Sequence, residues 1–173
     1  GMLFEIDNYR NSLTRTVKTH QTVFNKSHNV ESLALDESNN RLLIIAKDRD
    51  PSGNQTKGVY AFSLSNKQMS KGPVFTIDLD DDSFAELRSS KGQKRFRPSD
   101  MAIHPITKEL YILEGSHPKL MILSPEGKFK KLQLLNPDDF QQPEGISFSV
   151  DGTLYISNEK HTTEANILEV ILK

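Results

Sequence analysis

The sequence of 173 residues contains no cysteine. This excludes disulfide bonds, cysteine-based zinc sites and thiol catalysis, although it leaves the cellular compartment open. No apolar run approaches the roughly 20 residues that a membrane-spanning helix needs, so we expect no direct membrane insertion by this chain. The 22 basic and 23 acidic side chains nearly cancel, which gives no overall attraction for nucleic acid or anionic lipid.

The familiar signatures of catalysis are absent as well. The sequence holds no Gly-x-Ser-x-Gly elbow, no phosphate-binding loop, no dinucleotide fingerprint and no His-Glu-x-x-His zinc motif. A basic stretch over residues 88–97 contains one aromatic residue, Phe96, which is too little for a base-stacking platform. We therefore expect no nucleic-acid partner, and we expect binding rather than enzyme activity.

Three segments of the chain repeat one pattern. They cover residues 31–47, 99–115 and 144–159, and each contains a short alternating strand, a polar turn and a second apolar strand. Repeats of this size indicate stacked sheets, and we expect a β-propeller in which each copy gives the two inner strands of a blade. The predicted fold class is all-β, a partial or open propeller of about three to four blades of antiparallel strands with little helix.

Strand patterns around the copies define a single propeller-like domain or fragment, with blade parts at about residues 1–27, 28–80, 97–136 and 142–173. Asp82 or Ser83 is predicted to cap one or two helical turns that end at Gly92. The first blade part resembles outer strands whose inner partners would precede them. We therefore expect either a piece of a longer propeller or two copies that join edge to edge. Because unpaired blade edges favour pairing with another chain, a homodimer is one predicted assembly.

Each copy begins with a related octapeptide: residues 29–36 are NVESLALD, residues 97–104 are RPSDMAIH and residues 142–149 are QPEGISFS. These segments resemble successive blade starts of the SdiA-regulated family over about residues 28–172. The third copy, which continues into LYISNE at residues 154–159, is the nearest match. The first copy departs from the family pattern, because Ser32 follows Glu31 where glycine is typical.

The resemblance carries further expectations. It implies a propeller-like bacterial protein of the cell envelope or periplasm, because family members are usually exported or anchored by an N-terminal segment. They have no established activity. The match corresponds to the later part of the family's domain, so earlier blades would be missing from this chain.

Three residues occupy matching positions at the start of the innermost strands: Glu31, Ser99 and Glu144. Because the innermost strands of a propeller line its channel, we expect these residues to form a ligand-binding site at one channel mouth. Two carboxylates and a hydroxyl suit a hard cation such as Ca²⁺, with Glu31 and Glu144 as metal ligands. Crowded carboxylates also raise one pKa and supply a general acid or base. The structural alternative is that each glutamate accepts backbone N–H bonds from the neighbouring blade.

The second strand of each copy ends near another group of polar residues, which includes Glu114, Glu159 and Lys160. We expect these three on the rim near the channel, with solvated turns as the alternative. The sequence thus predicts a non-catalytic module that binds a small ligand or a protein of unknown identity. The alternative is a calcium-dependent hydrolase or lactonase, which the same carboxylates and a weaker similarity to gluconolactonase-like propellers support.

Overall fold

The computed structural model describes residues 1–53, 56–79 and 96–172, and these residues form four antiparallel sheets. The first sheet pairs β1 (Met2–Asp7) with β2 (Thr16–Gln21), and the second contains β3 (Val30–Asp36), β4 (Arg41–Ala46), β5 (Thr56–Ser63) and β6 (Phe75–Asp78). The third contains β7 (Pro98–Ile103), β8 (Leu110–Glu114), β9 (Lys119–Leu123) and β10 (Phe129–Leu134). The fourth contains β11 (Pro143–Phe148), β12 (Leu154–Asn158) and β13 (Asn166–Val170), and one 3-10 turn, η1 (Glu37–Asn39), joins β3 to β4.

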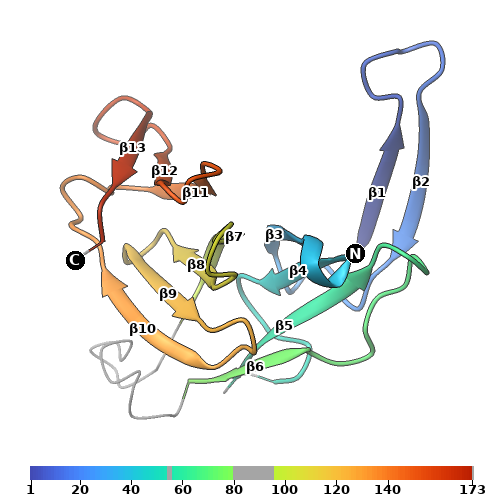
Figure 1. Cartoon of the computed structure of the whole chain (residues 1–173), viewed down its shortest axis with the longest axis horizontal. Coiled ribbons are helices and arrows are strands. Elements are labelled where there is room, and N and C mark those ends of the chain that lie inside the picture. Colours follow the sequence, from blue (N-terminus) through green and yellow to red (C-terminus); the bar gives the residue numbers. More distant parts are fainter. Residues whose placement is uncertain (54–55, 80–95, 173) are drawn as a thin grey trace.

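The sheets follow one another around an arc, as Figure 1 shows. The innermost strands β3, β7 and β11 lie side by side, and β6 and β10 lie on the outside of the arc. The β1–β2 hairpin and β13 stand at its two ends, with an opening between them (Figure 1). This is the all-β, open propeller that the repeats predict. The helical turns predicted between Asp82 and Gly92 lie outside the described residues.

Burial on both faces explains the sequence of the middle strands. Each of these strands lies between neighbouring sheets, so β4, β5, β8 and β9 carry nearly continuous apolar runs instead of an alternating pattern. The largest core cluster joins the second and third sheets and includes Leu43, Val59, Met101 and Ile112. A second cluster joins the third and fourth sheets, and a third joins the first and second. No helix in the described part of the chain is long and apolar enough to cross a membrane.

Several apolar side chains of the described strands are exposed. Ala34 of β3 packs into the core between the second and third sheets, whereas Leu33 and Leu35 point the other way and are half-exposed. On the hairpin, Phe4 and Ile6 are exposed as well. Leu3, their neighbour on β1, packs against the second sheet, so Phe4 and Ile6 face away from that sheet. The predicted homodimer would cover these exposed side chains, and it stays a prediction.

Candidate functional site

A β-bulge positions the predicted channel residue of each inner strand. The pairing register shifts between Val30 and Ser32 in β3, and it shifts at the matching places of β7 and β11. The extra residue in each strand is the one that the repeats align: Glu31, Ser99 and Glu144. A bulge leaves one residue outside the regular pairing and redirects its side chain, and such irregularities often lie beside functional sites.

Ser99 is held inside the protein. Its hydroxyl is buried and donates to the carbonyl oxygen of Pro143, at 3.0 Å, so it ties the third sheet to the fourth. Gly115 lies at the same junction: a Cβ there would come within 2.7 Å of the Pro143 oxygen and 3.4 Å of Oε1 of Glu144. Ser99 therefore stands next to Glu144, as the alignment predicts, but its hydroxyl serves the contact between sheets.

Lys47 pairs with one of the two channel glutamates and acts electrostatically on the other. The Lys47 ammonium group forms an ion pair with Oε2 of Glu31, and Nδ2 of Asn29 donates to its other oxygen. Burial raises the pKa of Glu144, Lys47 lowers it, and the negative charge of Glu31 raises it again. Glu31 and Glu144 thus lie within electrostatic range of each other, with the positive charge of Lys47 acting on both. Lys47 matches Gly115 and Glu159 in the other two copies, but the sequence does not show that it pairs with Glu31.

The rim residues divide into one that is buried and two that are exposed. Glu114 is 1% exposed, so the structure places it inside the protein rather than on an open rim. Its carboxylate pairs with Nζ of Lys119 at 3.1 Å, a contact between neighbouring strands of one sheet. Lys160 is exposed and pairs with Glu164 at 2.6 Å. Glu159 is also exposed, and its negative charge raises the pKa of Glu144.

We call Glu31, Lys47, Glu144 and Glu159 the mouth cluster. Within the described ranges, no group of three or more histidine, aspartate or glutamate side chains is placed to hold a metal ion. Because Lys47 already neutralises Glu31, a calcium ion would have to displace this ammonium group to use that carboxylate. The donor set therefore suits Ca²⁺ less well than the sequence predicts.

Asp100 is the residue that sequence reasoning missed. It follows Ser99 on β7, and its Oδ2 accepts a hydrogen bond from the backbone N–H of Ile146 on β11, at 2.9 Å. One alternative from the sequence is that Glu31 and Glu144 accept backbone N–H bonds from the neighbouring blade. Here Asp100 accepts such a bond. Burial raises the pKa of Asp100, whereas the N–H donors of Ile146 and Met101 lower it. The feature of the sequence that could have indicated this role is the position of Asp100 directly after Ser99, a predicted channel residue.

A groove of about 490 Å³ lies on the fourth sheet, and Gly145, the residue after Glu144 of the mouth cluster, lines it. Asp100 lines it together with a set of hydroxyl-bearing side chains, namely Ser147, Ser149, Tyr155 and Ser157. Gly145 at its floor lies so close to β12 that a Cβ would approach Oγ of Ser157 to 2.5 Å. Asp100 lines the groove, and its negative charge also raises the pKa of Glu144 in the mouth cluster. Ile146, Phe148 and Ile167 give the groove an apolar part as well.

A model of the SdiA-regulated family matches residues 3–162 of the chain. No curated protein matches it. Among solved structures, a protein from Lactobacillus plantarum is 11% identical, with a TM-score of 0.53, and the match covers 94% of this chain and 47% of that one. Virginiamycin B lyase from Staphylococcus aureus is 14% identical, with a TM-score of 0.47 and coverages of 86% and 44%. A protein of unknown function from Bacteroides thetaiotaomicron is 14% identical, with a TM-score of 0.49 and coverages of 75% and 30%. The chain thus spans less than half the length of these structures. At 11% identity, the match to the Lactobacillus plantarum protein shows a shared fold alone.

Proposed function

The chain belongs to the SdiA-regulated family, and we propose that it is a non-catalytic module that binds a cationic group on a small ligand or a partner protein. The observation that carries this proposal is the group of carboxylates at the bulged starts of the inner strands, where Glu31, Asp100 and Glu144 lie. Three other carboxylates, those of Glu31, Asp100 and Glu159, act on the pKa of Glu144, against the one ammonium group of Lys47. A second cation placed there would reduce the repulsion between these carboxylates, and it would favour the ionised form of Glu144.

The groove beside the cluster supplies room for the rest of a ligand. Its volume of about 490 Å³ lies within the range of about 300–1,000 Å³ that is typical of small-molecule sites. The hydroxyl groups of Ser147, Tyr155 and Ser157 provide hydrogen-bond donors and acceptors along it. The cluster would therefore hold an amine, and the groove would hold a polar body attached to it.

The donor set favours binding over calcium-dependent hydrolysis. A hydrolase of that kind needs several oxygen ligands around its ion. Here the hydroxyl of Ser99 bonds to a backbone carbonyl, and the carboxylate of Glu31 is paired with Lys47. The cell envelope remains the proposed location, and it follows from the family alone. Fractionation of cells that carry the complete gene tests it, because recovery in the cytosol contradicts it.

Spermidine, a linear polyamine, is a suitable probe for the mouth cluster. We expect calorimetric titration at low ionic strength to detect binding, and Glu144→Gln to weaken it several-fold. Lys47→Met removes the internal cation, so it is expected to strengthen binding and to raise the pKa of Glu144. Glu126→Gln is the control, because Glu126 lies on the β9–β10 turn and hydrogen-bonds to Ser124.

Glu144→Gln is expected to lower the affinity for spermidine and Lys47→Met to raise it. These opposite effects distinguish a specific site from a general loss of folding. If spermidine affinity is equal in the unaltered chain, Glu144→Gln and Lys47→Met, the proposal is wrong. A titration with Ca²⁺ tests the alternative. Calcium binding that both Glu31→Gln and Glu144→Gln abolish would favour the metal-dependent hydrolase instead.

A further inference from the structure

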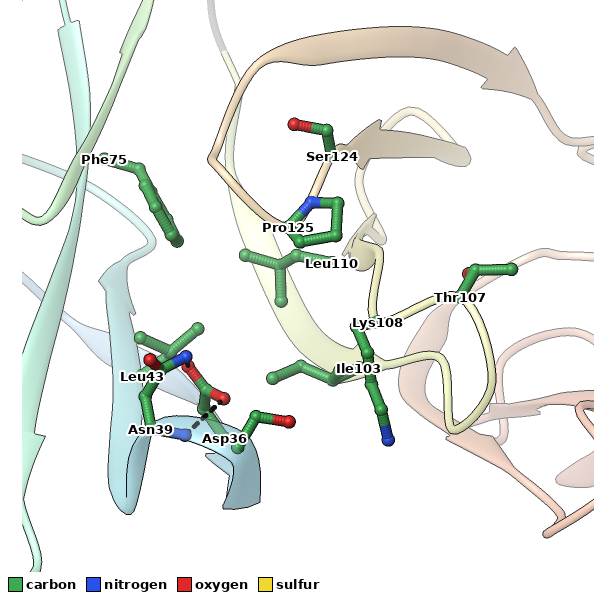
Figure 2. A pocket seen from close by; sticks show the side chains of 11 residues that line it. Asp36, Asn39, Leu43, Phe75, Ile103, Thr107, Lys108, Leu110, Ser124 and Pro125 are labelled. Atoms are coloured by element: carbon green, nitrogen blue, oxygen red, sulfur yellow. Dashed lines mark hydrogen bonds between the residues drawn. The ribbon is translucent and has the colours of Figure 1, made fainter.

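A second cavity of about 230 Å³ lies between the second and third sheets (Figure 2). Its walls come from the β3–β4 and β7–β8 turns, from β6 and from the β9–β10 turn. The lining residues are Asp36, Ser38, Asn39, Leu43, Phe75, Ile103, Thr107, Lys108, Leu110, Ser124 and Pro125. Strands β3 and β7 run from the mouth cluster toward this cavity, so the two sites lie at opposite ends of the same strands. We call this second site the turn pocket.

The base of the turn pocket is apolar and belongs to the main core. Leu43 and Leu110 are fully buried, and Phe75 and Ile103 pack against the same cluster. The wall beside Phe75 depends on a close turn: a Cβ at Gly127 would lie 2.2 Å from the Phe75 ring. Because rigid secondary structure supports these side chains, the cavity is preformed, as is usual for small-molecule sites.

The charges around the turn pocket are unbalanced. Oδ2 of Asp36 accepts hydrogen bonds from Nδ2 of Asn39 at 2.9 Å and from Nε of Arg41 at 2.8 Å, so this carboxylate is already neutralised. Lys108 lies across the cavity from Asp36 and Asn39 in Figure 2. Its ammonium group donates to the carbonyl oxygen of Pro105 at 2.6 Å, and it pairs with no carboxylate of the residues that the structure describes. Two of its three protons remain for a ligand.

Lys108 also occupies an unusual backbone position. Its φ angle is 60°, in the left-handed region, and the matching turn residues of the other copies are Asn40 and Gly152. Asparagine and glycine adopt this conformation readily, whereas a lysine is strained there. The third sheet therefore has a lysine at a turn position where the second and fourth sheets have asparagine and glycine, which adopt the left-handed conformation readily. Lys67 adopts the same conformation, with a φ angle of 57°, so what distinguishes Lys108 is its place in the lining of the turn pocket.

We propose that the turn pocket binds a small monocarboxylate with a compact apolar body, such as an aromatic acid. The carboxylate lies against the ammonium group of Lys108, on the side of the cavity where Ser38 also lines it. The apolar body lies against Leu43, Phe75 and Leu110. Its size fits, because a cavity of about 150 Å³ lined by similar side chains accepts benzene, and the larger volume here leaves room for a carboxylate.

Benzoate is the probe for this site. We expect methyl NMR signals of Leu43, Ile103 and Leu110 to shift on titration of the whole chain with benzoate. Lys108→Met is expected to weaken benzoate binding by at least fivefold while it leaves binding of the neutral benzyl alcohol unchanged. Lys128→Met is the matched control, because Lys128 lies on the adjoining β9–β10 turn but outside the pocket lining, and it should bind benzoate like the unaltered chain.

A second variant separates binding from folding. Lys108→Asn places a residue suited to the left-handed region at this position, so Tm should rise while benzoate affinity falls. The proposal is refuted if benzoate at millimolar concentration shifts none of the three methyl groups. Equal affinity of Lys108→Met and the unaltered chain for benzoate also refutes it, as does equal binding of benzoate and benzylamine.

Discussion

Removing one partner of the Glu114–Lys119 pair is expected to destabilise the protein strongly. The two side chains are only 2% and 6% exposed, and the carboxylate and ammonium groups are 3.1 Å apart. At an effective dielectric constant of about 20, the Coulomb attraction over this distance is about 5 kcal/mol before the cost of desolvation. Lys119→Met leaves a buried carboxylate with the N–H of Arg97, at 3.3 Å, and the exposed ring of His117, at 3.6 Å. Breaking a buried pair in this way costs about 3–5 kcal/mol.

Urea denaturation followed by circular dichroism measures this effect. With a slope of about 2 kcal/mol per molar urea, the midpoint should fall by about 2 M in Lys119→Met. The midpoint of Glu114→Gln should fall by a similar amount, because the buried Lys119 ammonium group loses its counter-charge and keeps neutral acceptors such as the carbonyl oxygen of His117. The double variant removes both buried charges and should lose about 1 kcal/mol or less, because buried pairs and neutral replacements are often equally stable.

The exposed Lys160–Glu164 pair is the matched control. Its charged groups are closer, at 2.6 Å, but its side chains are 66% and 82% exposed. Solvent screening limits such a pair to less than about 1 kcal/mol. The reasoning is refuted if Lys119→Met costs no more than Lys160→Met. It is also refuted if the effects of Glu114→Gln and Lys119→Met are additive, because a buried pair must show a coupling energy.

Three further predictions follow from burial and close packing. Desolvation lowers the pKa of buried Lys57 to about 8, so the unfolded chain binds more protons than the folded chain between about pH 8 and 10.5. The contribution of Lys57 to the free energy of unfolding should therefore rise with pH across that range. Urea titrations of Lys57→Met should lack this rise, and identical pH profiles for the variant and the unaltered chain would contradict the assignment. Gly115→Ala would place a Cβ 2.7 Å from the Pro143 oxygen and should cost about 1–3 kcal/mol by urea denaturation, so an unchanged midpoint would show that this junction can yield. The exposed apolar side chains predict that the chain self-associates. Light scattering should give the mass of a dimer, and the double variant Phe4→Ser with Leu35→Ser should give the mass of a monomer. A strict monomer before mutation would contradict the prediction.

The repeats were sufficient to predict the arrangement of strands. Alternating patterns and polar turns define each inner strand pair, and their alignment placed Glu31, Ser99 and Glu144 at one structural position. The structure confirms this equivalence, because each of the three is the bulged residue of its strand. Local sequence was enough here, since pleat, turn type and register depend on residues close together in the chain.

The roles of those side chains depended on contacts between sheets. The sequence gives no sign that Ser99 bonds to Pro143, 44 residues away, or that Asp100 rather than a glutamate accepts the N–H of Ile146. Glu114 ends its strand as expected, but packing around the third sheet determines that it is buried.

The sequence by itself determined the propeller fold and the matching positions of its copies, because these follow from local periodicity repeated along the chain. Only the tertiary structure decided which acidic side chains are exposed and which form ion pairs. It placed Lys47 against Glu31, and it left Lys108 without a carboxylate among the described residues. The physical reason is that burial and Coulomb interactions act over a few ångströms in space, whatever the separation of the residues along the chain.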